Sequence, residues 1–425
     1  MQLRYILLSV YIFLTIVVTA QDVVTTTSLT VCIEQAMINY PLAAQREVID
    51  KTSEASIEKI NAAWQPQVAL NGQASYQSDV PFIPGESPYF AFPILRKDQY
   101  KVELGVTQLI YDGGNISQAK SLQAIDNATQ KYQLETDLYK VKQQVIQLYA
   151  NILLATDNLE LIANTLKTLN DRKQDLLNGQ ANGVVTQLSI NVLEAEIIKT
   201  RQQQTETINT KQAAMKMLAG YTGESLSSNT NFQKPEITIV EEDNSITRPE
   251  IDLFKTQSEF TTQQKEFASG INLPQVSLFA TGGYGLPGPN FFLTQFDAYY
   301  MAGIKFNYPL WQGNIKKTDA AIYTLQNETI ANQQKTFELN TRIDSEQKMA
   351  DITKYNQLIE LDKQIVILKK EIMNATDVQL KNGVITSTDY VVELNGLLQV
   401  QQNQALHETQ LLIAKTNYLI TLGKL

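Results

Sequence analysis

The sequence predicts a mainly helical fold that also contributes to a membrane β-barrel and that arose by internal duplication. Two long segments, Asn115–Asn178 and Asn314–Asn382, contain neither glycine nor proline, the residues that most strongly interrupt helices. A pair of segments with alternating apolar and polar residues precedes each of them. The same order of elements therefore occurs twice in a chain of 425 residues.

Apolar residues in the first long segment follow a heptad pattern. They step by alternating fours and threes through Leu134, Leu138, Val141, Val145, Leu148, Ile152, Ala155, Leu159, Ile162, Leu166 and Leu169. Such a seam indicates one helix that packs lengthwise on others. At 1.5 Å per residue this helix reaches roughly 95 Å, which is too long for a compact domain.

Short motifs also indicate that the chain is duplicated. Three pairs of segments correspond: Asn182–Thr186 with Asn382–Thr386, Leu109–Gly113 with Pro309–Gly313, and Gln65–Val68 with Leu273–Val276. The first two pairs are 200 residues apart and the third is 208 residues apart. We therefore divide the chain into a signal peptide at 1–20, a first repeat at 21–220, a polar linker at 221–247 and a second repeat at 248–425.

The N-terminal segment has the features of an export signal. Arg4 supplies a positive charge, Tyr5–Val18 is apolar, and Val18-Thr19-Ala20 offers small residues for cleavage. A membrane helix is the alternative, but this apolar run is short for a span. No later apolar run approaches 18 residues, so the sequence predicts no other membrane helix.

The first repeat begins with a predicted helix from Ser28 to Trp64, in which Pro41 marks either a kink or a boundary between two helices. Residues 67–77 and 100–110 then alternate with a period of two, as strands with one apolar face do. A loop rich in proline and phenylalanine, residues 79–97, separates them. The second repeat has matching strands at 276–284 and 300–308.

The helical segments after the strands have unequal lengths. The helix that ends at Asn178 turns at 179–183 and returns only from Thr186 to about Met217. The helix predicted at 248–270 completes this return, whereas the N-terminal helix completes the return of 386–422. We therefore expect both termini to meet the 221–247 linker in a belt.

Four strands cannot stay open in a bilayer, where unpaired edges find no water. Three chains would close twelve strands around a lumen. The residues expected to line this lumen lie on the polar strand faces: Gln67, Asn71, Gln73, Lys101, Glu103 and Lys305. Aromatic residues at the strand ends suit the membrane interfaces: Trp64, Tyr111, Trp311, Tyr76 and Tyr284.

Taken together, the motifs resemble the TolC-like outer-membrane efflux proteins over essentially all of Gln21–Leu425. The resemblance is carried by Leu29-Thr30 to Pro41, Trp64–Val68, Leu273–Val276, Arg248-Pro249-Glu250, Tyr111–Gly114, Pro309–Gly313 and the two Asn-Gly-Val turns. It implies a homotrimer whose twelve-stranded outer-membrane barrel continues into a periplasmic α-barrel of long helical hairpins. The implied role is an exit channel for tripartite efflux or type I secretion, with a periplasmic adaptor and an inner-membrane transporter as partners.

The resemblance also implies roles for residues near the helical turns. Asp389 matches an acidic entrance residue, and Glu393 adjoins Val392 at the second such position. An acid in the first turn of a helix also stabilises the helix dipole, so either role fits Asp389. The turns implied to dock the adaptor are Asn182, Gly183, Val184, Asn382, Gly383 and Val384. Leu380 and Ile385 occupy the family's latch positions, so the latch is absent or built differently.

Other classes of function fit the sequence less well. The single histidine, His407, and the single cysteine, Cys32, exclude histidine-dependent triads and zinc ligand sets. We expect His407 at the surface, and no catalytic residue, metal or cofactor. A net charge of −9 without basic clusters argues against nucleic acid. A structural coiled-coil stalk or adaptor without a pore is the remaining alternative, which the amphipathic strand pairs oppose.

Overall fold

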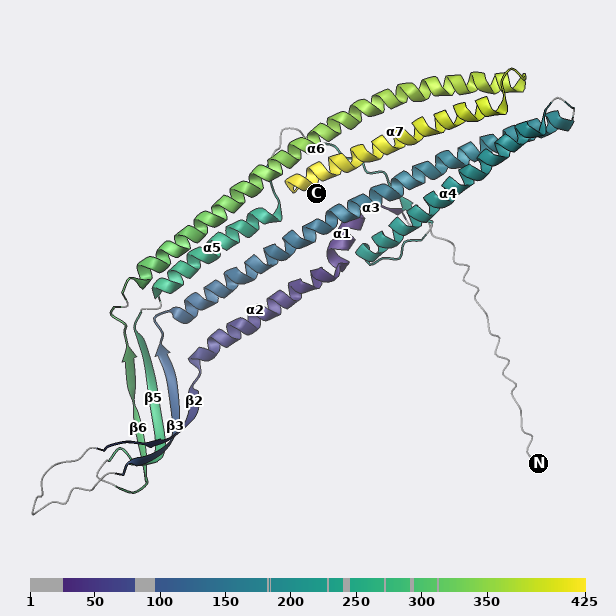
Figure 1. Ribbon diagram of the computed structural model, residues 1–425. Coiled ribbons are helices and arrows are strands. Elements are labelled where there is room, and N and C mark those ends of the chain that lie inside the picture. The colour runs from purple at the N-terminus through teal and green to yellow at the C-terminus, as the bar shows by residue number, and fades with distance from the viewer. Residues whose placement is uncertain are drawn as a thin grey trace, which may run out of the picture. The chain divides into compact units, whose positions relative to one another are not determined.

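The computed structural model describes residues 26–80, 96–181, 183, 185–227, 229–239, 245–270, 273–290, 294–311 and 313–425 (Figure 1). The predicted signal peptide at 1–20 lies outside these residues, as does most of the predicted loop at 79–97. The chain divides into two units. We call residues 40–143, 239–351 and 414–425 the sheet unit, and residues 1–39, 144–238 and 352–413 the tip unit.

The sheet unit contains a four-stranded antiparallel sheet in the order β2-β3-β5-β6 (Figure 1). Its strands are β2 (Gln67–Tyr76), β3 (Asp98–Tyr111), β5 (Gln275–Leu286) and β6 (Asp297–Asn307). All four lie where the period-two alternation predicted them, because one apolar face and one polar face favour a pleated strand. Among the described residues, neither β2 nor β6 has a second partner strand.

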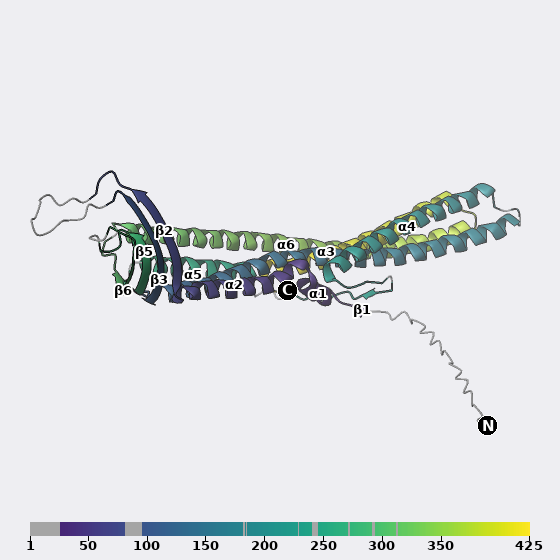
Figure 2. The ribbon, with the colours of Figure 1, turned by 90° about the horizontal axis from the view of Figure 1, so that it is seen from below.

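One helix joins each strand at the same end of the sheet. α2 (Gln45–Asn61) precedes β2 and α5 (Pro249–Gly270) precedes β5, whereas α3 (Asn115–Ala181) follows β3 and α6 (Ile315–Lys381) follows β6 (Figures 1 and 2). Ion pairs tie α2 to the first part of α3: Arg46 to Glu135 at 2.8 Å and Lys131 to Asp50 at 2.6 Å. α2 therefore lies beside the first part of α3.

The start of α3 shows how a strand passes into a helix. The buried Asp112 carboxylate accepts hydrogen bonds from the backbone N–H groups of Gly114 at 2.8 Å and Ile116 at 2.6 Å. These bonds satisfy N–H groups that a helix start leaves without an internal partner. Gly113 has a positive φ of 70°, and its Cα lies so close to Leu273 that an added Cβ would be 2.5 Å from the Leu273 Cβ. A glycine is needed here both for the backbone angle and for the close approach.

Pro41 proves to be a helix boundary. α1 (Leu29–Asn39) ends before it, and a short 3₁₀ turn, Pro41–Ala44, leads into α2. Proline at this point has no N–H to donate, which a first helical turn does not require.

The tip unit contains α1, the later part of α3, α4 (Gln187–Thr222), the later part of α6, and most of α7 (Ser387–Leu422). α3 with α4 and α6 with α7 form two helical hairpins (Figure 1). The heptad seam is buried except at Leu159 and Leu166, which are half-buried, and Val145, Ile152 and Leu169 have no exposed surface. Each such side chain contributes about 1.5–3 kcal/mol by leaving water.

Two elements of the tip unit differ from the sequence prediction. α4 extends to Thr222 instead of about Met217, and it ends at Gly223, which has a φ of 72°. Asn39 meets this end and donates to the Thr222 carbonyl at 2.6 Å. The predicted linker contains a two-residue strand, β4 (Asn231–Phe232). This strand pairs in parallel with β1 (Thr26–Thr27) near the start of the described chain.

The linker contacts both terminal segments of the described chain. In the tip unit, the fully buried Tyr149 hydroxyl donates to the Gln233 carbonyl at 2.7 Å beneath the β1–β4 pair. In the sheet unit, the Thr247 N–H donates to the Leu422 carbonyl at 2.8 Å, where α7 ends. Among the described residues, no helix combines the length and the apolar character that crossing a membrane requires.

Candidate functional site

The sheet has one apolar face, which the strand register assigns without ambiguity. Leu70 is opposite Leu104, Leu104 is opposite Gly282, and Gly282 is opposite Tyr300. The exposed apolar residues of this face are Val68, Leu70, Tyr76, Tyr100, Val102, Leu104, Leu278, Tyr284, Tyr300, Ile304 and Phe306. A contiguous exposed apolar surface of this kind marks a face that another apolar medium or protein covers.

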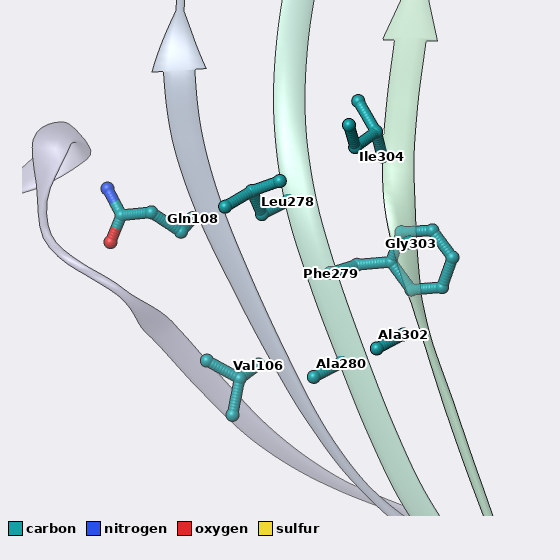
Figure 3. Close-up of a pocket in the computed structure, with 8 residues that line it drawn as sticks. All are labelled: Val106, Gln108, Leu278, Phe279, Ala280, Ala302, Gly303 and Ile304. Atoms are coloured by element: carbon teal, nitrogen blue, oxygen red, sulfur yellow. The ribbon is translucent and has the colours of Figure 1, made fainter.

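A shallow groove of about 460 Å³ lies on this sheet (Figure 3). Its lining is almost entirely apolar and comes from β3, β5 and β6: Val106, Gln108, Leu278, Phe279, Ala280, Ala302, Gly303 and Ile304. The Phe279 ring reaches over Gly303 on the neighbouring strand (Figure 3). The groove carries no cluster of polar side chains that would orient a ligand. Six of its lining residues share the side of the sheet that carries Leu104, whereas the strand register places Phe279, opposite Thr107 and Gly303, on the other face.

The six residues predicted to line a lumen all lie on the opposite face. Gln67 is opposite Thr107, Asn71 is opposite Glu103, and Gln73 is opposite Lys101. Lys305 shares this face through its pairing with Ser277 on β5. The separation of an apolar from a polar face is therefore a property of the folded sheet.

Sequence reasoning missed the residue of the polar face that contacts Glu103 from another strand. The Tyr299 hydroxyl on β6 donates to Glu103 Oε1 on β3 at 2.6 Å, and Lys101 Nζ lies 2.5 Å from the same oxygen. Only the strand register brings Tyr299 close to Glu103, because 196 residues separate them in sequence.

The two helical turns have the backbone geometry that their glycines predicted. Gly183 has a φ of 75° and Gly383 a φ of 70°, and a Cβ at either position would meet open space. In the second turn, the Asn382 side chain donates to the Val378 carbonyl at 2.9 Å, and Val384 is exposed. Asn182 and Val184 of the first turn lie outside the described residues.

Asp389 closes the first turn of α7. Its carboxylate accepts hydrogen bonds from the Thr386 N–H at 3.0 Å and the Thr386 hydroxyl at 2.7 Å, while its own N–H donates to that hydroxyl. These bonds lower the pKa of the exposed Asp389 carboxyl. Ser189, the corresponding residue of the first repeat, lies 3.1 Å from the Thr186 hydroxyl and shows that a carboxylate is not required there.

Glu393 also has a partner within the chain. Its carboxylate pairs with Lys369 Nζ at 2.9 Å, which connects α7 to α6. Each proposed entrance residue thus has a local structural role.

An apolar cluster and an ion pair connect the two tip hairpins near their turns. Leu380 and Ile385, the residues at the expected latch positions, pack against a cluster that includes Leu169, Leu193 and Tyr390. Burial raises the pKa of Tyr390 to about 12. The polar link comes from elsewhere: Arg172 Nε on α3 lies 2.7 Å from Asp377 on α6, and both side chains are mostly buried.

His407 is less exposed than predicted. Its Nδ1 lies 2.6 Å from the Asp362 carboxylate on α6, and 22% of its side chain is exposed. A charged partner on a neighbouring helix draws this imidazole inward, which helix position alone does not reveal.

Neither a known family model nor a curated protein matches the sequence. Solved structures do match. VceC of Vibrio cholerae is 17% identical with a TM-score of 0.62, over 93% of this chain and 96% of that one. CusC is 12% identical with a TM-score of 0.68, over 93% and 92% of the two chains. The CmeC outer-membrane channel of Campylobacter jejuni is 13% identical with a TM-score of 0.63, over 93% and 85%.

These likenesses extend along nearly the whole chain, although few residues are identical. They confirm the predicted fold, which combines long helical hairpins with four strands per chain. The chain shares the fold of the TolC-like outer-membrane channels.

Proposed function

We propose that three copies of this chain form an outer-membrane channel that extends into the periplasm. It would pass substrates from the periplasm or from an inner-membrane transporter to the exterior, within a tripartite efflux or type I secretion system. The observation that carries this proposal is the four-stranded sheet, which has an exposed apolar face and two edges that pair with no other strand in the described part of the chain. Such a sheet is stable in a bilayer only when further strands close it.

The internal duplication indicates how the open edges pair. The hairpins β2–β3 and β5–β6 have the same register, because Gln67 is opposite Thr107 and Gln275 is opposite Asn307. These partners differ by the same 208 and 200 residues that separate the repeated motifs. The β3–β5 junction inside the chain is therefore a template for a junction between β6 and β2 of the next copy.

The template predicts a specific register at this junction. Leu104 is opposite Gly282 inside the chain. The corresponding residues are Ile304, 200 positions later, and Ala74, 208 positions earlier. Ile304 of one copy should therefore be opposite Ala74 of the next copy. The same rule sets Phe306 opposite Gly72, on the apolar face.

Three copies suit a channel better than two. Two copies would form eight strands, and a barrel of that size has an interior that side chains fill. Twelve strands leave a lumen, which the polar face would line. The names of the matched structures, which include a transmembrane channel and an outer-membrane channel, support the same assignment.

Cysteine cross-linking tests the arrangement. In a Cys32→Ala background, Ile304→Cys with Ala74→Cys should form disulfide-linked dimers and trimers in isolated membranes, because paired strands lie within disulfide reach. Ile304→Cys with Ser75→Cys is the matched control, since Ser75 is one residue away and on the opposite face. Equal cross-linking of both pairs, or of neither, would contradict the proposed junction.

The alternative function is a structural coiled-coil stalk or adaptor without a pore. Fractionation distinguishes the two functions. A channel should stay in the outer-membrane fraction after salt and carbonate washing and yield a trimer in mild detergent, whereas a stalk would be released by the washes.

The partners in this proposal are a periplasmic adaptor and an inner-membrane transporter, which would engage the turns at Gly183 and Gly383. Gly183 and Gly383 are both exposed, so these two residues are accessible within the chain. Co-purification from cross-linked cells, with the captured partners identified by mass spectrometry, tests this part. Recovery of an adaptor with wild-type protein, and its loss from a variant with substituted turns, is the expected result.

A further inference from the structure

One row of residues crosses the polar face of the sheet and forms a connected cluster. The strand register aligns Asn71 on β2, Glu103 on β3, Gly283 on β5 and Tyr299 on β6. The Tyr299 side chain passes over Gly283 and donates its hydroxyl hydrogen to Glu103 Oε1. A single hydrogen bond thus links two strands that are separated by a third.

Glu103 is also paired with the cation of the preceding row. Lys101 Nζ lies 2.5 Å from the oxygen that Tyr299 contacts, so the carboxylate and the ammonium neutralise each other within one chain. The other charged residues on this face are Asp297 and Lys305, one acid and one base. The polar face of the four strands therefore carries ionisable groups whose charges sum to zero.

Gly283 is the residue that permits the cluster. A Cβ at this position would lie 2.5 Å from Tyr299 Cζ and 2.7 Å from its hydroxyl oxygen, closer than atoms in van der Waals contact. Without a side chain at 283, the tyrosine ring lies along the sheet instead of standing away from it. Gly282, the preceding residue, is on the apolar face and has open space where its Cβ would be.

We infer that the cluster of Lys101, Glu103 and Tyr299 over Gly283 is a charge-neutral belt of the barrel wall, which keeps the lumen there from selecting between anions and cations. The inference rests on the proposed channel, in which three copies of the cluster face one lumen. Because each Glu103 is paired with Lys101, the belt lets anionic and cationic solutes pass alike. Because each Tyr299 lies across Gly283, the belt also keeps the bore wide.

Two isosteric substitutions test the electrostatic part. Glu103→Gln leaves three uncompensated ammonium groups at the belt, whereas Lys101→Gln leaves three uncompensated carboxylates. In planar bilayers with a salt gradient near 0.1 M, where the screening length is about 10 Å, the reversal potential should shift toward anion selectivity in the first variant and toward cation selectivity in the second. At about 1 M salt, where the screening length is about 3 Å, both shifts should shrink.

The glycine pair tests the steric part. Gly283→Ala should lower single-channel conductance, because the methyl group forces the Tyr299 ring off the wall and into the bore. Gly282→Ala, on the opposite face, should conduct like the wild-type protein. Equal conductance in the two variants would overturn the steric role.

The outcomes separate this inference from the proposed function. If wild-type protein conducts but Glu103→Gln and Lys101→Gln leave the reversal potential unchanged, or shift it in the same direction, the belt does not set selectivity and the channel assignment stands. If wild-type trimer inserted into the bilayer does not conduct, the proposed function is refuted and this inference with it.

Discussion

Two glycines at equivalent strand-to-helix joints offer a direct comparison between packing inside the chain and packing between copies. Gly113 and Gly313 both have positive φ, 70° and 67°. A Cβ on Gly113 would lie 2.5 Å from Leu273 Cβ, whereas a Cβ on Gly313 would have no atom within 4 Å. The backbone requirement is therefore shared, and only Gly113 meets a neighbour in its own chain.

The difference sets the expected costs of alanine at the two positions. A left-handed conformation costs a non-glycine residue roughly 1–2 kcal/mol. Forcing a methyl group into an occupied site adds typically about 1–3 kcal/mol. Gly113→Ala should therefore destabilise the protomer by about 2–5 kcal/mol, and Gly313→Ala by only about 1–2 kcal/mol.

The proposed trimer changes the result for Gly313. Leu273 corresponds to Gln65, 208 positions earlier, so the repeat template places Gln65 of the next copy beside Gly313. Gly313→Ala should then yield a folded chain that assembles poorly, whereas Gly113→Ala should reduce folding itself. Circular dichroism of refolded protein measures folding, and the temperature at which the trimer dissociates on a gel measures assembly.

Gly282→Ala is the control, since its Cβ would meet open space and its backbone is not left-handed. Identical behaviour of Gly113→Ala and Gly313→Ala in both assays would refute the reasoning. A Gly313→Ala trimer as heat-stable as the wild type would refute the repeat template.

Five further outcomes can be tested. Leu104→Arg, on the apolar face, should cost about 2–4 kcal/mol near the bilayer midplane and reduce assembled trimer, whereas Thr107→Arg on the polar face should assemble normally; equal defects would show that the faces are misassigned. Asp389 has a lowered pKa in the folded chain, so its stabilising effect is present above the carboxyl's unfolded pKa and is lost as pH falls through the folded value. The difference in heat stability between wild type and Asp389→Asn should therefore vanish in acid. A separate test concerns the entrance. If three copies of Asp389 form a ring there, multivalent cations added from the periplasmic side should block the wild-type channel but not Asp389→Ala. Gly383→Val should abolish efflux in cells while leaving the trimer intact, and undiminished efflux would remove the docking role of this turn. Arg172→Ala should cost about 1–3 kcal/mol by removing the cation that pairs with the mostly buried Asp377 on α6, which faster hydrogen exchange in the tip hairpins would report.

Much of the fold is determined by local sequence patterns. The long helices follow from heptads without glycine or proline, and the strands from alternation between Gln67 and Tyr76 and its repeat at Gln275. The same period sets which strand residues share a face, because a repeat of two leaves only one choice of side. Left-handed turns at Gly183 and Gly383 follow from the need for a residue without a Cβ.

Only the tertiary structure decides the contacts that join distant segments. The β1–β4 pair has two residues per strand, too few to show any periodicity, and the buried Tyr149 hydroxyl holds it in place. The end of α4 depends on Asn39 meeting Gly223. The Tyr299–Glu103 bond exists because strand pairing aligns their rows over Gly283. Periodicity is a property of neighbours along the chain, whereas each of these contacts depends on which distant residues the packed chain brings within hydrogen-bond distance.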